Sequence, residues 1–305
     1  MRRVWWSGSG SGGGVADNPP LDPTEGSVPR PKRSAGRNLP VAIATGVGLG
    51  GALVAALVLS PPVFVAFLLG IVMLALVELV NVLRARATRP ARPVVFPLAV
   101  LLVVGAYVEG PAALSFGMMV ALLAAFFWYL VDPQRTEVTR NVAATVFAVC
   151  YVPFLAAHLA LVVSRADHYV GAIIGYALVV VAYDTAAYAT GVLIGRHPLA
   201  PHVSPNKSWE GAAGATVACL AVGAFVLPLW QPWSLGPGLT LAAVACVAAP
   251  LGDLAESMLK RDLAVKDMGS ILPGHGGMLD RVDALLFMAP ALYYVLALFS
   301  LVRSS

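Results

Sequence analysis

The stretch 257–283 holds the densest collection of residues that could carry out chemistry in this chain. It combines cations that neutralise phosphates, carboxylates that are hard ligands for magnesium, and glycines that let backbone N–H groups approach a ligand. Its residues are Lys260, Arg261, Lys266 and Arg281, with Asp262, Asp267, Asp280 and Asp283, and the run 273–277 that contains His275, Gly276 and Gly277. The combination predicts a magnesium–nucleotide site. A solvated loop of mixed charge, with His275 as an ordinary hydrogen-bonding residue, is the alternative.

Four acids fall inside apolar stretches, where a charge is costly. They are Glu78, Asp184, Asp253 and Glu256. On insertion scales an Asp at the centre of a spanning helix costs about 2.5–3.5 kcal/mol, so such acids generally face a polar cavity, a metal or a neighbouring helix. Asp253 and Glu256 are three residues apart and share a helix face just before the charged stretch. They are candidates for the same site, whereas a hydrogen bond to a neighbouring helix explains Glu78 equally well.

Apolar helices must position these residues, because the composition does not suit a water-soluble surface. Hydrophobic types make up 59% of the 305 residues and charged types 12%, against about 25% charged in soluble domains. A spanning helix needs about 20 mostly apolar residues, which predicts an all-α polytopic membrane protein with about nine transmembrane helices in a lipid bilayer. The predicted spans are 39–59, 61–83, 94–108, 111–131, 141–163, 169–194, 211–229, 237–256 and 284–302.

The basic residues are sorted by side of the membrane if the spans alternate. All of the 20 lysines and arginines fall on the side of the N-terminus except Arg165 and Arg303. The positive-inside rule then places the N-terminus in the cytoplasm. The long connections 195–210 and 257–283 lie on the same side. The sequence therefore predicts an integral protein of the plasma (inner) membrane whose active site faces the cytoplasm.

Three regions follow from these patterns. Residues 1–38 are rich in Gly, Ser and Pro and are predicted to form a disordered cytoplasmic tail. Residues 39–165 form the N-terminal transmembrane helices, and residues 166–305 form the catalytic transmembrane region. The net charge of +4 is too small to indicate a nucleic-acid partner, and the three cysteines lie in apolar segments without metal-ligand spacing.

Two blocks of the sequence resemble the phosphatidate cytidylyltransferase (CDP-diacylglycerol synthase) family. The family signature is a Ser, then Lys-Arg, four residues, Lys-Asp, a small residue, His-Gly-Gly and Asp-Arg-x-Asp. The matching residues here are Ser257, Lys260, Arg261, Lys266, Asp267, Gly269, Pro273, His275, Gly276, Gly277, Asp280, Arg281 and Asp283. The second block runs from Asp184 to Gly211 and includes Ser204-Pro205-Asn206-Lys207-Ser208. So many matched positions in the same order make the resemblance specific.

The resemblance implies a reaction and its participants. CTP and phosphatidic acid would give CDP-diacylglycerol and pyrophosphate, with Mg²⁺ as the cofactor and a second cation left open. Asp253 and Asp280 match the family's metal ligands, and Asp283 would be a further ligand. Asp184 would belong to the substrate site and is the next candidate for a metal ligand. The other implied site residues are Lys260, Arg261, Lys266 and Arg281 for phosphates, His275 for a phosphate or a proton, and Ser204, Lys207, Ser208, Gly276 and Gly277 to complete the substrate site. The resemblance also suggests a homodimer.

Three other functions stay open at this point. A CTP-dependent lipid kinase would also place a nucleotide beside membrane helices, but it would release CDP instead of pyrophosphate. A membrane transporter would use buried acids as an ion path, although the acids here gather at one face and no inverted repeat is evident. A structural or assembly protein would leave the charged connections unexplained.

The charge sorting predicts which connections face each side. In a background without native cysteines, single cysteines within 84–93, 196–208 and 258–282 should react with a membrane-impermeant maleimide only after cells are opened. A cysteine within 164–168 should react in intact cells and serves as the control. Labelling of 258–282 from outside intact cells would contradict both the orientation and a cytoplasmic site.

Overall fold

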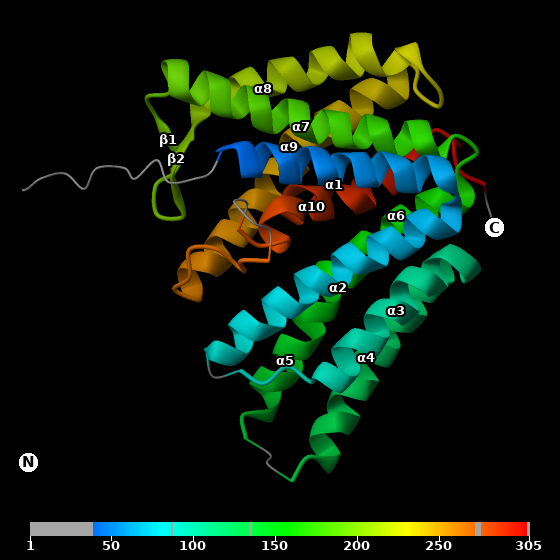
Figure 1. The fold of residues 1–305 in the computed structure, drawn as a ribbon, viewed down its shortest axis with the longest axis vertical. Coiled ribbons are helices and arrows are strands. Elements are labelled where there is room, and N and C mark those ends of the chain that lie inside the picture. Colours follow the sequence, from blue (N-terminus) through cyan, green and yellow to red (C-terminus); the bar gives the residue numbers. More distant parts are fainter. Residues whose placement is uncertain (1–38, 87, 134–135, 272–275, 304–305) are drawn as a thin grey trace, which may run out of the picture. The chain divides into compact units, whose positions relative to one another are not determined.

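A computed structural model describes residues 39–86, 88–133, 136–271 and 276–303, with side chains from residue 44 onward. The predictions for the tail 1–38 and for His275 lie outside the described residues. Helices make up most of the described chain (Figure 1).

Most elements follow one another closely along the chain, and η marks short π or 3₁₀ turns. In chain order they are α1 (Leu39–Leu59), α2 (Pro61–Ala85), α3 (Arg92–Glu109), α4 (Pro111–Val131), α5 (Val138–Val149), η1 (Cys150–Phe154), α6 (Leu155–Arg165), α7 (Tyr169–Ile194), β1 (Pro198–Ala200), β2 (Ser204–Ser208), α8 (Trp209–Ala221), η2 (Val222–Val226), η3 (Leu227–Leu229), α9 (Leu235–Asp262) and α10 (Leu279–Leu298).

Eight helical segments of the described chain are long and apolar enough to span a membrane. They include the continuous runs α5–η1–α6 (Val138–Arg165) and α8–η2–η3 (Trp209–Leu229). Helix α1 is 21 residues long, and its described apolar part is Ala44–Leu59. The predicted all-α polytopic architecture is confirmed, while a ninth span at α1 and the orientation in the membrane stay predictions.

Helices α9 and α10 extend furthest beyond the spans that hydropathy predicted. Helix α9 continues from the predicted end at residue 256 to Asp262, and α10 begins at Leu279 instead of residue 284. Hydropathy identifies only the lipid-embedded length of a helix, whereas backbone hydrogen bonding can continue through polar turns. Much of the charged stretch 257–283 is therefore helical, with Lys260 and Arg261 in the last turn of α9 and Asp280 in the first turn of α10.

A short antiparallel β-hairpin, β1–β2, adds a small sheet to the predicted all-α fold. Glu210, in the first turn of α8, accepts hydrogen bonds from the backbone N–H groups of Arg196 (3.0 Å) and His197 (3.2 Å). These bonds tie the start of the hairpin to the helix that follows it. The polar connection between α7 and α8 is consequently an ordered element.

Helices α6 and α10 lie centrally among the packed helices (Figure 1). Helix α10 packs against α9, α7, α6 and α2, and α6 also packs against α3. On either side of these central helices, α3 packs closely against α4, and α7 packs closely against α8. Helix α10, which carries two of the candidate acids, therefore contacts helices from both ends of the sequence.

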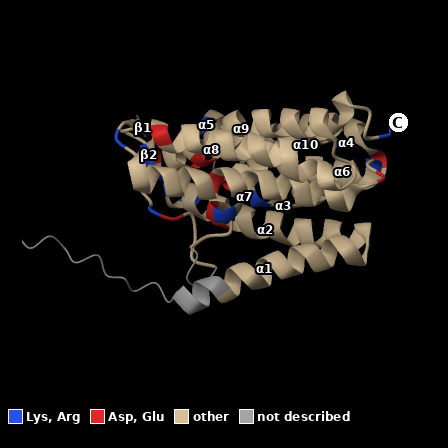
Figure 2. Cartoon of the chain, turned by 90° about the horizontal axis from the view of Figure 1, so that it is seen from above, with Lys and Arg blue, Asp and Glu red and all other residues tan. Residues whose placement is uncertain are grey.

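Charged residues lie mainly toward the ends of the helices, as Figure 2 shows. At the end that carries the hairpin, Arg86 donates a hydrogen bond to the carbonyl of Ala264 at 3.0 Å. At the other end, Arg303 ion-pairs with Asp167, and its backbone N–H donates to the carbonyl of Arg165 at 2.9 Å. The two basic residues that the sequence placed opposite all the others thus lie together at one end.

A carboxylate from α2 holds the N-terminus of α10. Glu78 is 3% exposed, and its two oxygens accept hydrogen bonds from the backbone N–H groups of Met278 and Leu279, each at 2.9 Å. The first N–H groups of a helix lack partners within the helix and carry partial positive charge, so a carboxylate stabilises them. Of the two explanations for Glu78, the structure supports the hydrogen bond to a neighbouring helix.

Glu78→Gln should destabilise the folded protein. The amide keeps the shape but points an NH₂ donor at a backbone N–H, so a hydrogen bond to a charged acceptor is lost at a cost of about 1.5–3 kcal/mol. Thermal unfolding in detergent should show a lower midpoint than wild type. The control is Glu137→Gln, because Glu137 pairs with Arg140 on an exposed surface, where such pairs contribute about 0–1 kcal/mol. Equal midpoints for the two variants would contradict the capping role.

Candidate active site

Helices α9 and α10 approach each other closely at Gly252. A Cβ at this glycine would lie 2.7 Å from the carbonyl oxygen of Asp283 and 3.0 Å from the Cα of Ala284. A larger residue could be accommodated only if one helix moved. The close crossing brings the acidic turn of α9, which carries Asp253 and Glu256, next to the acidic turn of α10.

Lys260 joins the two helices through their carboxylates. Its ammonium lies 2.5 Å from Oε2 of Glu256, one turn earlier on α9, and 2.8 Å from Oδ1 of Asp280 on α10. The exposed fractions of the three side chains are 18%, 1% and 6% for Lys260, Glu256 and Asp280. Shielding from water strengthens these attractions and makes the loss of one partner costly.

The second oxygen of Asp280 organises the connection that precedes α10. It accepts hydrogen bonds from the backbone N–H groups of Met268 (2.9 Å) and Gly277 (3.0 Å). Gly276 has a φ of 82°, a conformation that favours glycine. Gly276 therefore has a conformational role, and a Cβ at Gly277 would lie 2.7 Å from Oε2 of Glu78. Contact of either glycine with substrate stays a prediction.

The β-hairpin reaches the same site from another direction. Lys207, on β2, forms an ion pair with Asp253 on α9. Arg261, at the end of α9, donates a hydrogen bond from Nε to the carbonyl of Val203 in the hairpin turn, at 3.2 Å. The two sequence blocks that carry the family resemblance are thus in direct contact.

Five carboxylates share this region of the bundle, on helices α7, α9 and α10. They belong to Asp184, Asp253, Glu256, Asp280 and Asp283. Electrostatic repulsion acts between them across the helices, as between Asp184 and Asp253 and between Asp253 and Asp283. Lys207 and Lys260 form ion pairs with three of the five. Because the carboxylates outnumber the lysines paired with them, the site is suited to bind additional cations.

Two buried polar atoms near these carboxylates have no hydrogen-bond partner among the described residues. One is Oε1 of Glu256, and the other is the hydroxyl of Tyr151, which lies in the π turn η1 within electrostatic range of Glu256. An unpaired buried polar group costs about 1–3 kcal/mol. In native proteins such groups commonly indicate a water, an ion or a ligand, and π turns are frequent at functional sites. The hydroxyl of Tyr151 therefore points to a partner from outside the chain, whereas the carboxyl group of Glu256 also lies within hydrogen-bonding reach of Asp283.

The remaining predicted site residues lie at the edge of this cluster. Ser208 caps α8, because its hydroxyl accepts the backbone N–H of Gly211 at 3.1 Å. Ser204 is half-buried on β2, whereas Lys266 and Arg281 are exposed. The structure thus shows a structural role for Ser208. The phosphate contacts of Lys266 and Arg281, and the part of Ser204 in completing the substrate site, stay predictions.

The sequence pointed to Glu256 as a candidate beside Asp253 but assigned it no role, and it did not point to Tyr151 at all. The signal for Glu256 was available, because it is an acid one helical turn from Asp253 in an apolar stretch. Tyr151 gave no signal, since a tyrosine in an apolar span is common and its position depends on the π turn. The capping role of Glu78 depends on backbone groups 200 residues away, which local patterns do not reveal.

The donor set suits a hard divalent cation. Mg²⁺ generally takes one or two protein carboxylates, and waters and substrate phosphates fill its other positions. In the part of the chain that the structure describes, no three acidic, His or Cys side chains already form a common ligand set. Asp253 and Asp280 are each paired with a lysine. The residues therefore fit a cation that protein carboxylates and substrate phosphates hold jointly.

Comparisons with known proteins agree with this chemistry. A model of the cytidylyltransferase family matches residues 40–299. A phosphatidate cytidylyltransferase of Mycobacterium leprae is 37% identical over 90% of this chain and 96% of its own length. Proteins of the same name from Bacillus subtilis and Brucella suis are 38% and 46% identical, over 63% and 38% of this chain and 71% and 43% of their own lengths. The chain, a membrane-embedded nucleotidyltransferase, belongs to the cytidylyltransferase family.

Proposed function

We propose that this enzyme transfers the cytidylyl group of CTP to phosphatidic acid, giving CDP-diacylglycerol and pyrophosphate. An oxygen of the lipid phosphate attacks the α-phosphorus of CTP. A new P–O bond forms while the bond from the α-phosphorus to the oxygen bridging to the β-phosphate breaks, and pyrophosphate leaves with that electron pair. The relatives' names support the reaction. The observation that carries it is the single cluster of carboxylates and lysines in which both sequence blocks meet.

The proposal includes Mg²⁺ held by Asp253 and Asp280, with Asp283 as a ligand for it or for a second cation. Both substrates are anionic, so a cluster with more carboxylates than paired lysines would otherwise repel them. When bound, the cation supplies charge neutralisation for the phosphates. Lys207 and Lys260 now pair with these acids. They are placed to turn toward phosphates when the carboxylates take up a cation.

The basic residues then position the two substrates. Lys207, Lys260 and Arg261 approach the site from the hairpin and from the end of α9. Lys266 and Arg281 are exposed at its edge, where they can meet phosphates as these arrive from solvent or from the lipid surface. Phosphoryl-type transfers depend mostly on positioning and charge neutralisation, so no covalent intermediate on the protein is required.

The site faces the cytoplasm of the plasma membrane in this proposal. The hairpin and the charged connection between α9 and α10 lie at the helix ends opposite Arg165 and Arg303, which supports the orientation derived from charge sorting. CTP is a water-soluble substrate and would reach the site from that side. Association into a homodimer stays a prediction from the family resemblance.

The reaction can be tested with purified protein, phosphatidic acid, Mg²⁺ and CTP labelled at the α-phosphorus. The label should appear in a lipid product on thin-layer plates, with an equal amount of pyrophosphate released. A CTP-dependent lipid kinase would transfer label only from the γ-phosphorus and would release CDP. Failure to label any lipid from either position would contradict the proposed function.

Asp253→Asn should lower kcat by at least about a hundredfold, like the loss of one catalytic electrostatic group. The amide keeps the size of the side chain but removes the charge that binds a hard cation. Asp280→Asn should lower activity as strongly, although it also disturbs the hydrogen bonds to Met268 and Gly277. The double variant should be little worse than either single one, because ligands of one metal act as a unit.

The matched control for these variants is Asp262→Asn, since Asp262 is exposed at the end of α9. Its activity should stay within a few-fold of wild type. Thermal unfolding of each variant separates a lost ligand from a lost fold. Near-normal turnover of Asp253→Asn at saturating Mg²⁺ would show that this carboxylate is structural.

A further inference from the structure

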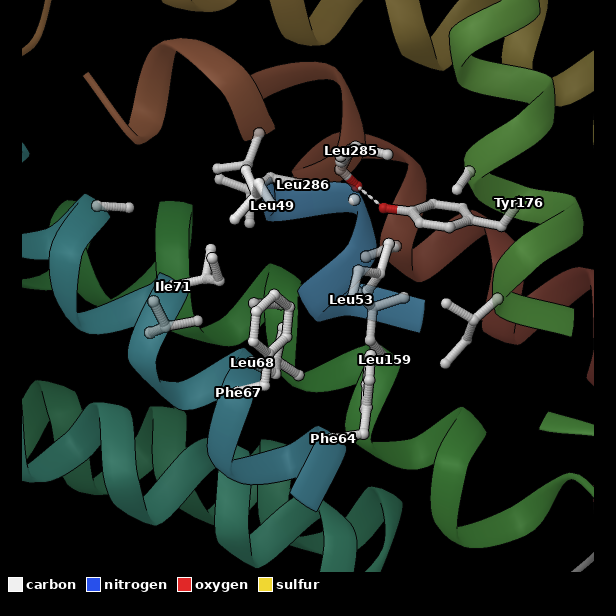
Figure 3. A pocket seen from close by; sticks show the side chains of 18 of the residues that line it. Leu49, Leu53, Phe64, Phe67, Leu68, Ile71, Leu159, Tyr176, Leu285 and Leu286 are labelled. Atoms are coloured by element: carbon white, nitrogen blue, oxygen red, sulfur yellow. Dashed lines mark hydrogen bonds between the residues drawn. The ribbon is translucent and has the colours of Figure 1, made fainter. Parts of the chain in front are cut away.

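An apolar cavity of about 330 Å³ lies among α1, α2, α6, α7 and α10 (Figure 3). Its walls are leucine, isoleucine, valine, phenylalanine, alanine and glycine, with Tyr176 as the one residue that carries a polar side-chain group. The hydroxyl of Tyr176 donates a hydrogen bond to the carbonyl of Leu285 at 2.6 Å, so it already has a partner. The cavity therefore offers an occupant only apolar contacts.

The cavity ends one helical turn from the acidic cluster. Ala177 and Val181 line it on α7, and Asp184 follows three residues later on the same face, about 4.5 Å further along the axis. On α2 the lining residue Ala75 is followed, again three residues later, by Glu78, which caps α10. An occupant of the cavity would thus begin directly beneath the polar site.

The cavity is also elongated along the helices. Its lining on α2 runs from Phe64 to Ala75, which corresponds to about 16 Å at 1.5 Å per residue. Its volume is at the lower end of the range for ligand pockets, about 300–1,000 Å³. Apolar cavities of this kind do not hold ordered water, because water finds no hydrogen-bond partners there. The geometry suits a single flexible hydrocarbon chain.

We propose that this cavity binds one acyl chain of the phosphatidic acid while the phosphate of the same lipid lies at the acidic cluster. The assignment rests on the proposed reaction, which brings a diacyl lipid to this site. A phosphate near Lys207, with its glycerol beside Asp184, would direct one chain along α7 into the cavity. The other chain would stay in the bilayer.

Such a cavity would select among lipids more than it would increase affinity. Bilayer hydrocarbon is as apolar as the leucines of the cavity, so moving a chain between them gains little hydrophobic free energy. The fit of the chain to the walls then decides the preference, as it does in other apolar pockets. Chain length should therefore affect the KM for phosphatidic acid and leave the KM for CTP unchanged.

Helix α1 provides a position where the cavity can be filled without disturbing the core. Gly50 lines the cavity, and a Cβ added there would have no atom within 4 Å. Gly50→Leu would project a branched side chain into the space. Gly51→Leu is the matched control, because a Cβ at Gly51 also meets nothing within 4 Å and this residue does not line the cavity. Both changes add the same volume and helix propensity.

Steady-state kinetics with dioctanoyl and dipalmitoyl phosphatidic acid test the assignment. Gly50→Leu should raise the KM for the dipalmitoyl lipid by at least about tenfold relative to Gly51→Leu, with a much smaller change for the dioctanoyl lipid, whose chains leave the deep part of the cavity unused. Matching chain-length profiles for the two variants would overturn the assignment but leave the reaction intact. A wild-type protein that converts neither lipid would overturn the proposed function as well.

A second measurement uses the wild-type protein and so does not depend on how a variant folds. A phosphatidic acid with a diazirine at the far end of one acyl chain is photolysed with the protein, and the labelled peptides are mapped. Label should appear on α2 near Phe64 and Leu68, at the deep end of the cavity. Label found only on outward-facing positions, such as Phe126 and Phe127 of α4, would contradict the assignment.

Discussion

The paired contacts of Lys260 with Glu256 and Asp280 are the interaction on which the candidate site depends. One ammonium compensates two carboxylates from different helices inside a bundle whose other contacts are mainly apolar. A charge left without a partner in such surroundings is strongly destabilising, so each of the three groups needs a partner of opposite charge. Gly252 makes this possible, because the absence of a side chain lets α9 and α10 approach closely enough for their acidic turns to meet.

Other segments are attached to this centre by charged contacts of their own. The carboxylate of Glu78 fixes the start of α10, Lys207 connects the hairpin to Asp253, and Asp280 binds two backbone N–H groups of the preceding connection. Lysines and carboxylates that neutralise one another in the free enzyme can exchange partners when anionic phosphates and a cation arrive together. The same charged side chains that stabilise the fold can therefore contact the substrates. Fewer charges are then needed in a membrane interior, where each charge must be compensated.

Much of this arrangement could be predicted from the sequence, because hydropathy, charge sorting and residue chemistry are local properties. The spans and the grouping of the basic residues follow from such patterns, whereas the choice of Asp253 with Asp280 as metal ligands came from the family resemblance. The placement of Lys260 and Asp280 within helices could not be predicted, because a hydropathy scale does not distinguish polar turns at helix ends from loops. The hairpin, the cap that Glu78 provides and the apolar cavity all depend on contacts between distant segments, and no spacing in the sequence encodes those contacts.

The central claim is that carboxylates of α9 and α10 hold a divalent cation together with the phosphates of CTP. Electron paramagnetic resonance with Mn²⁺ in place of Mg²⁺ tests this most directly, using purified protein and an unreactive CTP analogue with isotopically labelled phosphate oxygens. We expect bound Mn²⁺ whose signal is broadened by the labelled oxygens, and loss of that bound signal in Asp253→Asn. Mn²⁺ that binds equally well to the variant, or that shows no broadening by the nucleotide, would contradict the claim.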